Sequence, residues 1–239
     1  LYQGEAGTGA AGSIATHRFS YSEAQVRRIL QAAIGLARSR RGRLCVVTKP
    51  CGTPTVSALW QRVAAELTRG QELEVREMEV DNACYQLVAD ARSFDVVVAP
   101  NMFGDVLADG ASVLLGSRGM SYSGNFAGDG RAVYQTGHGA AYDLAGSDRA
   151  NPLGQVQSLA MLLEHSFGLT QAAEDIRAAV NAVLAGGWRT ADIMEAGTRQ
   201  LGTRELAERV AEELGRARET AATAGLAEVG EDAACPAAG

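Results

Sequence analysis

Two aspartates in the sequence, Asp105 and Asp109, have a spacing that suits the binding of a divalent cation. In a helix, residues four apart lie on one face, so the two carboxylates repel each other unless positive charge lies between them. A hard divalent cation bound through oxygen supplies that charge. The alternative is a solvated helix face on which Asp105 favours the helix N-terminus. The spacing leaves both interpretations open.

Lys49 and Asp81 each follow a segment typical of a β-strand, and the ends of parallel strands are where ligand-binding residues gather. Lys49 is the single lysine among 22 Lys and Arg residues. Lysine, unlike arginine, can be tuned into a proton acceptor. For Lys49 the alternative is a surface lysine, and for Asp81 it is a cap of the helix that follows. No local pattern marks Tyr2 as functional.

A third candidate is the Gly-rich segment HGAAYDLAG (138–146), which leads through RANP (149–152) into a helix. Its small residues would let a nucleotide approach the backbone, and Asp143 could accept hydrogen bonds from ribose hydroxyls. The segment lacks the GxGxxG pattern of dinucleotide-binding folds. The alternative is a structural loop in which Asp143 caps a turn and His138 is an ordinary loop residue.

The elements that must position these residues alternate between strand and helix, which predicts an α/β fold. We expect strands at 44–48, 73–80 and 94–100. Helices are expected from Ser22, from Pro54, after Asp81 and over 102–116. Residues 3–20 are Gly- and Ala-rich and predict a loop or a hairpin arm.

Beyond Gly116 the sequence becomes Gly- and Ser-rich, with a short strand expected at 132–136. Helices are expected at 151–167, 171–185 and 203–218. We therefore expect one lobe over 1–116, a second over 117–218 and a disordered tail over 219–239.

Composition excludes several classes of protein. No window of 18 apolar residues exists, so no membrane span is expected. The net charge of −6 argues against a nucleic-acid or anionic-lipid surface. The four cysteines have neither zinc-ligand spacing nor the density of a disulfide scaffold, which favours a reducing, cytoplasmic location. The Ala-, Gly- and Arg-rich composition is typical of a GC-rich genome, so single arginines carry little information.

Taken together, several phrases resemble one family, the metal-dependent β-decarboxylating dehydrogenases that act on isopropylmalate, isocitrate, homoisocitrate, tartrate or D-malate. The phrases, in order, are LYQGE, VVTKP, VDNACYQLV, FDVVVAPNMFGDVLAD, HGAAYDLAG, RANP and LAMLLEHSFGL. The likeness is strongest to isopropylmalate dehydrogenases. It implies the family's two-lobed fold without its N-terminal part, with 1–116 as the substrate and dimerisation lobe and 117–218 as part of the cofactor lobe.

The resemblance implies a role for each candidate. Tyr2 matches the acid that protonates the enol formed on decarboxylation, and Lys49 matches the lysine that assists removal of the hydroxyl proton. Asp81, Asp105 and Asp109 match the carboxylates around Mg²⁺ or Mn²⁺. In the family, the lysine and the first of these aspartates reach the site from the second subunit of a homodimer. The arm at 3–20 is expected to be exchanged between the subunits.

The resemblance also implies an NAD site. Asp143 falls where NAD-dependent members carry an acid, which would repel a 2′-phosphate. Tyr142 departs from the family's usual proline. The residues implied in cofactor binding are His138, Gly139, Ala140, Ala141, Asp143 and Asn151.

The implied reaction oxidises a small (2R)-hydroxy acid of malate type, either 3-isopropylmalate-like or tartrate/malate-like, with NAD as hydride acceptor and loss of CO₂. The arginines that clamp the substrate's carboxylates lie upstream in the family, so we expect this chain alone to be inactive. One alternative is a non-catalytic or vestigial subunit that still forms dimers. Another is a metal-dependent lyase or hydrolase that uses the same carboxylates.

Overall fold

The computed structural model describes residues 2–231, with the backbone alone at 2, 218 and 220–231, and divides the chain after Ala111 into two compact units. This division lies slightly before the predicted lobe boundary at Gly116. The reason is local packing, because the 3₁₀ turn η2 (Val113–Leu115) contacts the 3₁₀ turn η3 (Arg118–Met120) of the second unit.

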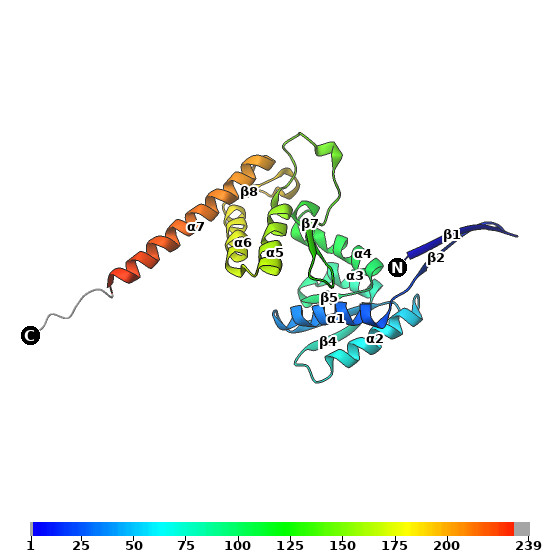
Figure 1. Cartoon of the computed structure of the whole chain (residues 1–239). Coiled ribbons are helices and arrows are strands. Elements are labelled where there is room, and N and C mark those ends of the chain that lie inside the picture. Colours follow the sequence, from blue (N-terminus) through cyan, green and yellow to red (C-terminus); the bar gives the residue numbers. More distant parts are fainter. Residues whose placement is uncertain (1, 232–239) are drawn as a thin grey trace, which may run out of the picture. The chain divides into compact units, whose positions relative to one another are not determined.

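A three-stranded parallel sheet forms the centre of the first unit (Figure 1). β3 (Arg43–Thr48) lies between β4 (Glu74–Glu79) and β5 (Val96–Val98). β3 is buried from Leu44 to Thr48. Because successive side chains of a strand point to opposite faces, both faces of this strand must be covered. The expected α/β fold is confirmed.

Helices α1 (Glu23–Arg38) and α2 (Pro54–Thr68) cover one face of this sheet. They form a single apolar cluster with the β3 side chains Leu44 and Val46. Trp60 of α2 is the largest side chain in this cluster and is 2% exposed. Burial of the apolar faces of α1 and α2 against the strands holds these two helices to the sheet.

The opposite face of β3 presents Cys45 and Val47 to a second apolar cluster. α3 (Val80–Ala89) contributes to this cluster, as does α4 (Asn101–Ser112) through Leu107. α3 follows β4 directly and α4 follows β5, and each helix packs against the face of the sheet that carries this cluster. This packing fixes the direction of each helix relative to its strand.

The segment predicted as a loop or arm is a β-hairpin of β1 (Tyr2–Gly9) and β2 (Gly12–Phe19). The strands pair in antiparallel register, with Tyr2 opposite Phe19 and Gly9 opposite Gly12. Residues 3–18 are exposed except for the half-buried Gly9. Two residues after β2, the ring of Tyr21 packs edge-on against the ring of Trp60, with 5.9 Å between the ring centroids. Exchange of the hairpin with a second subunit stays a prediction.

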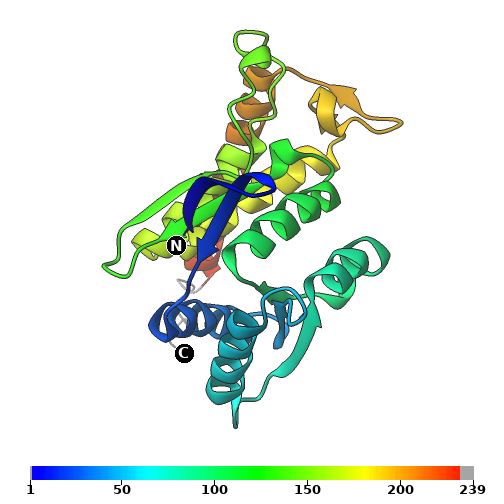
Figure 2. The ribbon, with the colours of Figure 1, turned by 90° about the vertical axis from the view of Figure 1, so that its right-hand side faces the viewer.

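In the second unit, β6 (Tyr122–Phe126) and β7 (Ala132–Thr136) form an antiparallel hairpin. Figure 2 shows this hairpin beside α5 (Leu153–Phe167), which it contacts through both strands. β7 has the bounds that the sequence predicts. Tyr134 reaches the helix end, where its hydroxyl lies 2.9 Å from the hydroxyl of Ser166.

α6 (Thr170–Ala185) and α7 (Thr203–Glu231) pack with α5 around a core that includes Leu153, Val180 and Leu206. The short parallel strands β8 (Trp188–Arg189) and β9 (Arg199–Gln200) join α6 to α7. α7 continues through Glu231, so the disordered tail predicted over 219–239 is wrong for 219–231. The segment is rich in Ala and Glu, a composition that suggested disorder, but both residues also have a high helix propensity. Residues 232–239 lie outside the described residues.

Among the described residues, we find no helix with the length and apolar character that crossing a membrane would require.

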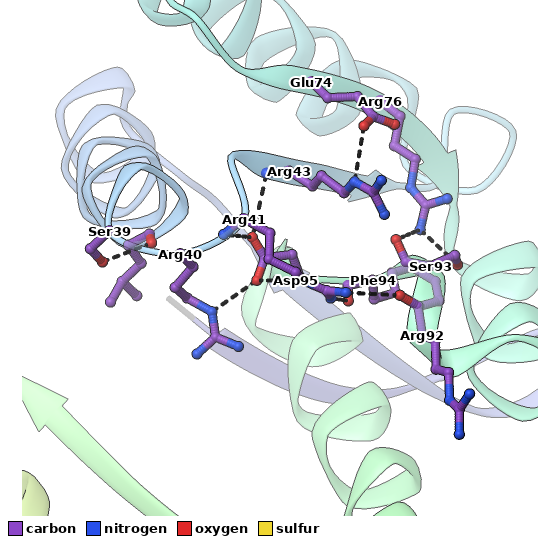
Figure 3. A network of polar contacts seen from close by, with 11 residues as sticks. Ser39, Arg40, Arg41, Arg43, Glu74, Arg76, Arg92, Ser93, Phe94 and Asp95 are labelled. Atoms are coloured by element: carbon purple, nitrogen blue, oxygen red, sulfur yellow. Dashed lines mark hydrogen bonds and ion pairs between the residues drawn. The ribbon is translucent and has the colours of Figure 1, made fainter. Parts of the chain in front are cut away.

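A buried carboxylate closes the amino edge of the first unit's sheet (Figure 3). The side chain of Asp95, just before β5, is 0% exposed. One of its oxygens accepts a hydrogen bond from Arg40 Nε at 2.9 Å, and the other accepts from the backbone N–H of Arg41 at 3.0 Å. The backbone N–H of Arg43 is a third donor at 3.4 Å. Asp95 thus joins the turn between α1 and β3 to the start of β5.

Burial by itself raises the pKa of Asp95, but the hydrogen bond from Arg40 and those from the backbone of Arg43 and Arg41 outweigh it. The pKa of Asp95 therefore lies below its ordinary value. A carboxylate with a lowered folded-state pKa stabilises the fold above its unfolded-state pKa, and the contribution is lost as pH falls through the folded-state pKa.

We expect Asp95→Asn to lower the free energy of unfolding at pH 7 by about 1–3 kcal/mol, because the donors around it lose a charged acceptor. The difference from the wild-type chain should shrink as the pH falls below about 4, the ordinary pKa of an aspartate, because the unfolded wild-type chain then takes up a proton that the folded chain still excludes. Thermal unfolding followed by circular dichroism at both pH values measures this. Asp90→Asn, at an exposed aspartate of the same unit, is the control. An equal loss at both pH values would contradict the assignment.

Candidate active site

The first unit gathers its candidate residues at the carboxyl edge of the sheet. Lys49 directly follows β3, and Asp81 lies in the first turn of α3, directly after β4. α4, with Asp105 and Asp109, follows β5. Because the three strands are parallel, these positions share one edge, which is the usual place for a ligand site in an open α/β sheet.

Lys49 lies between two carboxylates. Its Nζ donates to Glu79 Oε2 at 2.7 Å and to Asp81 Oδ1 at 2.8 Å. Hydrogen bonding to Asp81, and then to Glu79, raises the pKa of Lys49 above its ordinary value, although burial opposes the shift. In this arrangement Lys49 is an ammonium that donates hydrogen bonds.

The backbone around Lys49 is held by the turn between β3 and α2. Its N–H donates to Ser57 Oγ at 3.2 Å, and its carbonyl accepts from the N–H of Thr53 at 2.7 Å. Gly52 leaves room for the lysine stem, since a Cβ there would lie 3.1 Å from Lys49 Cγ. The base of the lysine side chain is therefore fixed while its tip stays accessible, with 27% of the side chain exposed.

Asp81 lies on a face of α3 that its own unit leaves uncovered. Its side chain is 69% exposed. Tyr85 and Val88 are four and seven residues further along, hence on the same helix face, and are 68% and 86% exposed. The hydrogen bond from Lys49, and then those from the helix backbone, hold the pKa of Asp81 below its ordinary value.

α4 has a similar face. Asp105 and Asp109 are exposed, which is compatible with both interpretations of their spacing, the cation site and the solvated helix face. The apolar side chains Met102 and Val106 of the same helix are 47% and 62% exposed. In the described part of this single chain, no group of three or more His, Cys, Asp or Glu side chains is arranged to hold a metal ion. Asp81 is therefore not gathered with Asp105 and Asp109 within one chain.

The three carboxylates nevertheless have the oxygen ligands that a hard cation prefers, and they form two separate groups. One group is the pair Asp105 and Asp109, one helical turn apart, and the other is Asp81. Each group lies on a helix face that also exposes large apolar side chains.

Two tyrosines lie at the beginning of the first unit. Tyr2 begins β1, and its side chain lies outside the described side chains. Tyr21 was not predicted as a site residue, but its hydroxyl accepts a hydrogen bond from the N–H of Asn101 at 3.0 Å. Tyr21 thereby fixes the start of α4, the helix that carries the aspartate pair.

The candidate cofactor loop lies in the second unit, where it borders a hollow of about 600 Å³. Of the predicted cofactor residues, His138, Ala140 and Ala141 line this hollow, whereas Gly139, Asp143 and Asn151 are not among its lining residues. Thr203 and Arg204 at the start of α7 form another part of its wall. Ala141 has a left-handed backbone (φ +43°), and Asp143 in the turn that follows is exposed. The ring of His138 bonds only locally in the described structure, with Nδ1 2.8 Å from the carbonyl oxygen of Gly139. An open, small-residue surface of this kind has room for a nucleotide.

Asp148 ties this loop to α7. One carboxylate oxygen accepts from the N–H of Arg204 at 3.0 Å, and the backbone carbonyl of Asp148 accepts from the N–H of Thr203 at 3.0 Å. Asp148 has φ +55°. Gly202 is required beside it, because a Cβ there would lie 2.2 Å from an oxygen of Asp148.

Both polar atoms of the Asn151 side chain make hydrogen bonds within the second unit. Its Oδ1 accepts from the N–H of Leu153 at 2.9 Å at the start of α5, and its Nδ2 donates to Asp192 at 3.1 Å. Asp192 also accepts from Thr190 Oγ1 at 2.6 Å. Burial raises the pKa of Asp192, but hydrogen bonds from Ser117, Thr190 and Asn151 together lower it below the ordinary value. Adenine recognition by Asn151 stays a prediction.

Sequence reasoning missed three carboxylates, Glu79, Asp148 and Asp192. Glu79 ends an alternating strand and has no motif. Asp148 lies in a Gly- and Ser-rich segment. Aspartate tolerates a left-handed backbone better than most residues do, and this was the one local sign that Asp148 could hold a turn. Asp192 acquires its partners only through the fold.

Comparison with known proteins gives a consistent result. Residues 1–210 match the family model described as isocitrate/isopropylmalate dehydrogenase. The 3-isopropylmalate dehydrogenase of Synechococcus sp. (strain JA-3-3Ab) is 47% identical over 192 residues, which are 80% of this chain and 50% of that protein. The 3-isopropylmalate dehydrogenase of Bordetella pertussis is 43% identical over 196 residues, which are 82% of this chain and 54% of that protein.

Solved structures agree. The crystal structure of isocitrate dehydrogenase from Methylococcus capsulatus superposes with a TM-score of 0.80 at 29% identity, covering 90% of this chain and 62% of that one. The β-decarboxylating dehydrogenase of Thermococcus kodakarensis, in its apo form, gives a TM-score of 0.74 at 31% identity with the same coverage. The chain thus spans about half the length of the curated relatives it matches.

We expect Asp148→Ala to loosen the cofactor loop, because α7 loses a capping carboxylate and alanine is strained at a positive φ. Amide hydrogen exchange should become faster over 138–147. Asp148→Asn, which keeps an oxygen acceptor and tolerates the backbone, should leave exchange close to wild type. Equal exchange in both variants would mean that the carboxamide or carboxylate oxygen is not the anchor.

Proposed function

Because the chain belongs to the isocitrate/isopropylmalate dehydrogenase family, we propose that it forms part of an enzyme that oxidatively decarboxylates a (2R)-hydroxy acid of malate type, with NAD and Mg²⁺ or Mn²⁺. The observation that carries the proposal is the lysine held between carboxylates at the carboxyl edge of the sheet, with Lys49 Nζ 2.8 Å from Asp81. The second carboxylate pair follows the neighbouring strand β5 on α4.

The proposed enzyme is a homodimer with shared active sites. Asp81 lies on an exposed apolar face of α3, and Asp105 and Asp109 lie on one of α4. Covering these faces with a second copy removes apolar surface from water. We assign Lys49 and Asp81 to the site that contains Asp105 and Asp109 of the second subunit. The hairpin arm at 3–20 is exchanged between the same two chains.

Within this site, Asp81, Asp105 and Asp109 hold the cation. A divalent cation bound there would supply positive charge beside the C2 oxygen of the substrate, while NAD would supply the hydride acceptor. Lys49 acts in base catalysis on the substrate's hydroxyl proton, and Tyr2 acts as the acid that protonates the enol left after loss of CO₂. Because Lys49 is an ammonium in the present arrangement, its part in base catalysis requires that Nζ first lose a proton.

NAD is assigned to the hollow of the second unit. His138, Gly139, Ala140 and Ala141 border the dinucleotide, and Asn151 lies at its adenine side. The exposed carboxylate of Asp143 favours a ribose 2′-hydroxyl over a 2′-phosphate, because it accepts a hydrogen bond from the former and repels the latter.

The substrate is proposed to be 3-isopropylmalate or a close 2-hydroxy diacid, since the curated relatives described above are named 3-isopropylmalate dehydrogenases. A non-catalytic subunit draws no support from relatives named as enzymes. A cytoplasmic location is part of the proposal and rests on the cysteine content of the sequence.

In a full-length enzyme that contains this chain, we expect Asp105→Asn to weaken Mn²⁺ binding and turnover together, each by at least about tenfold, because the cation loses a charged oxygen ligand. Calorimetry with Mn²⁺ and NADH absorbance measure the two effects. Asp129→Asn, at an exposed turn of the second unit, should change neither. Unchanged metal dependence would remove Asp105 from the ligands. The full-length enzyme is used because we expect residues 1–239 alone not to turn over, and NADH formation by them would contradict that expectation.

Val106→Asp is expected to convert the dimer of this chain to a monomer, because it places a charge within the proposed apolar interface. Sedimentation velocity measures the change. Val133→Asp is the matched control, since Val133 is 59% exposed and Val106 is 62% exposed. A wild-type chain that sediments as a stable monomer would contradict both the dimer and the exchanged arm.

A further inference from the structure

Glu79 is the partner of Lys49 that has no role in the proposed function. Its Oε2 lies 2.7 Å from Lys49 Nζ, so the ammonium is bound as closely by this carboxylate as by Asp81. An ammonium has three N–H donors. Glu79 and Asp81 accept hydrogen bonds from two of them.

The position of Glu79 is set by the sheet. It is the last residue of β4 and lies opposite Thr48, the residue before Lys49, in the parallel register. Glu79 is also the residue that precedes the first turn of α3, but its side chain makes no capping hydrogen bond to the helix. Its carboxylate is therefore available to Lys49, and its backbone cannot shift without disturbing the strand pairing.

Asp81 is held less firmly. It lies beyond the ladder, in the first turn of α3, and 69% of its side chain is exposed, against 43% for Glu79. A carboxylate that binds a cation has less negative charge to offer a neighbouring ammonium. If Lys49 depended on Asp81 alone, cation binding would release it.

The geometry points to Glu79 as a positioning residue that keeps the Lys49 ammonium at the carboxyl edge when Asp81 engages a cation. Glu79 acts through Lys49 and does not touch the substrate. This inference rests on the proposed function for its purpose, but the pairing itself can be tested without metal, cofactor or substrate.

The test uses the fact that Lys49 is the only lysine of the chain. Residues 1–239 made with lysine labelled at its side-chain nitrogen give one ammonium signal in a ¹H–¹⁵N spectrum. Exchange of its protons with water is slowed by hydrogen bonding. Asp81→Ala imitates the loss of Asp81 to a cation, and the double variant Asp81→Ala/Glu79→Ala sets the rate for an unpaired Lys49. The matched control is Asp81→Ala/Glu77→Ala, since Glu77 is on the same strand and pairs with Gln61 instead.

We expect Lys49 in Asp81→Ala to exchange severalfold more slowly than in the double variant, and the control to match Asp81→Ala. Exchange in Asp81→Ala as fast as in the double variant would overturn the inference. So would an equal acceleration by Glu77→Ala. Circular dichroism verifies that each variant is folded, and Asp81→Ala/Glu79→Val, which also lacks an acceptor and suits a strand, replaces the double variant if that one is not. Because no arm contains metal or substrate, a failed dehydrogenase assay and a failed exchange test are separate results.

Discussion

The parallel pairing of β3 with β4 and β5 is the constraint on which the first unit depends. It buries β3 on both faces, so helices must cover both. It also sets Thr48 beside Glu79, and this register brings Lys49 within reach of Asp81. A shift of one residue would exchange the side chains that β3 presents to its two helix layers and would change the separation of Lys49 and Asp81. Packing and site geometry are therefore two results of the same ladder.

The two edges of this sheet use charge in opposite ways. At the amino edge, a fully buried carboxylate, Asp95, is bound by an arginine and by backbone amides of the turn between α1 and β3. At the carboxyl edge, one cation, Lys49, lies between two partly exposed carboxylates. The first arrangement has little freedom and stabilises the fold. The second keeps negative charge accessible, which is what binding a further cation requires.

Much of this fold could be predicted from local sequence. Ser22 caps α1 as expected, with Gln25 completing the capping box, and the apolar run around Val96 marks the strand β5. Glu79 could not be predicted, because its importance depends on a register between strands 30 residues apart. The end of α7 was missed for a different reason, since an Ala- and Glu-rich segment satisfies both a disordered and a helical interpretation. Family resemblance named the three aspartates, but their distribution over two exposed helix faces required the structure.

The β1–β2 hairpin has a consequence for the order of folding events. A two-stranded ribbon with nearly every residue exposed is at most marginally stable in water, because it has no core of its own. The sheet and its helices form their two buried apolar clusters within one chain, so this core folds at a rate independent of protein concentration. The ribbon becomes persistent only when another surface buries it. Where that surface belongs to a second copy, as in the proposed exchange of the arm, ordering of the ribbon is a second-order process that follows folding of the unit, with kinetics that slow on dilution.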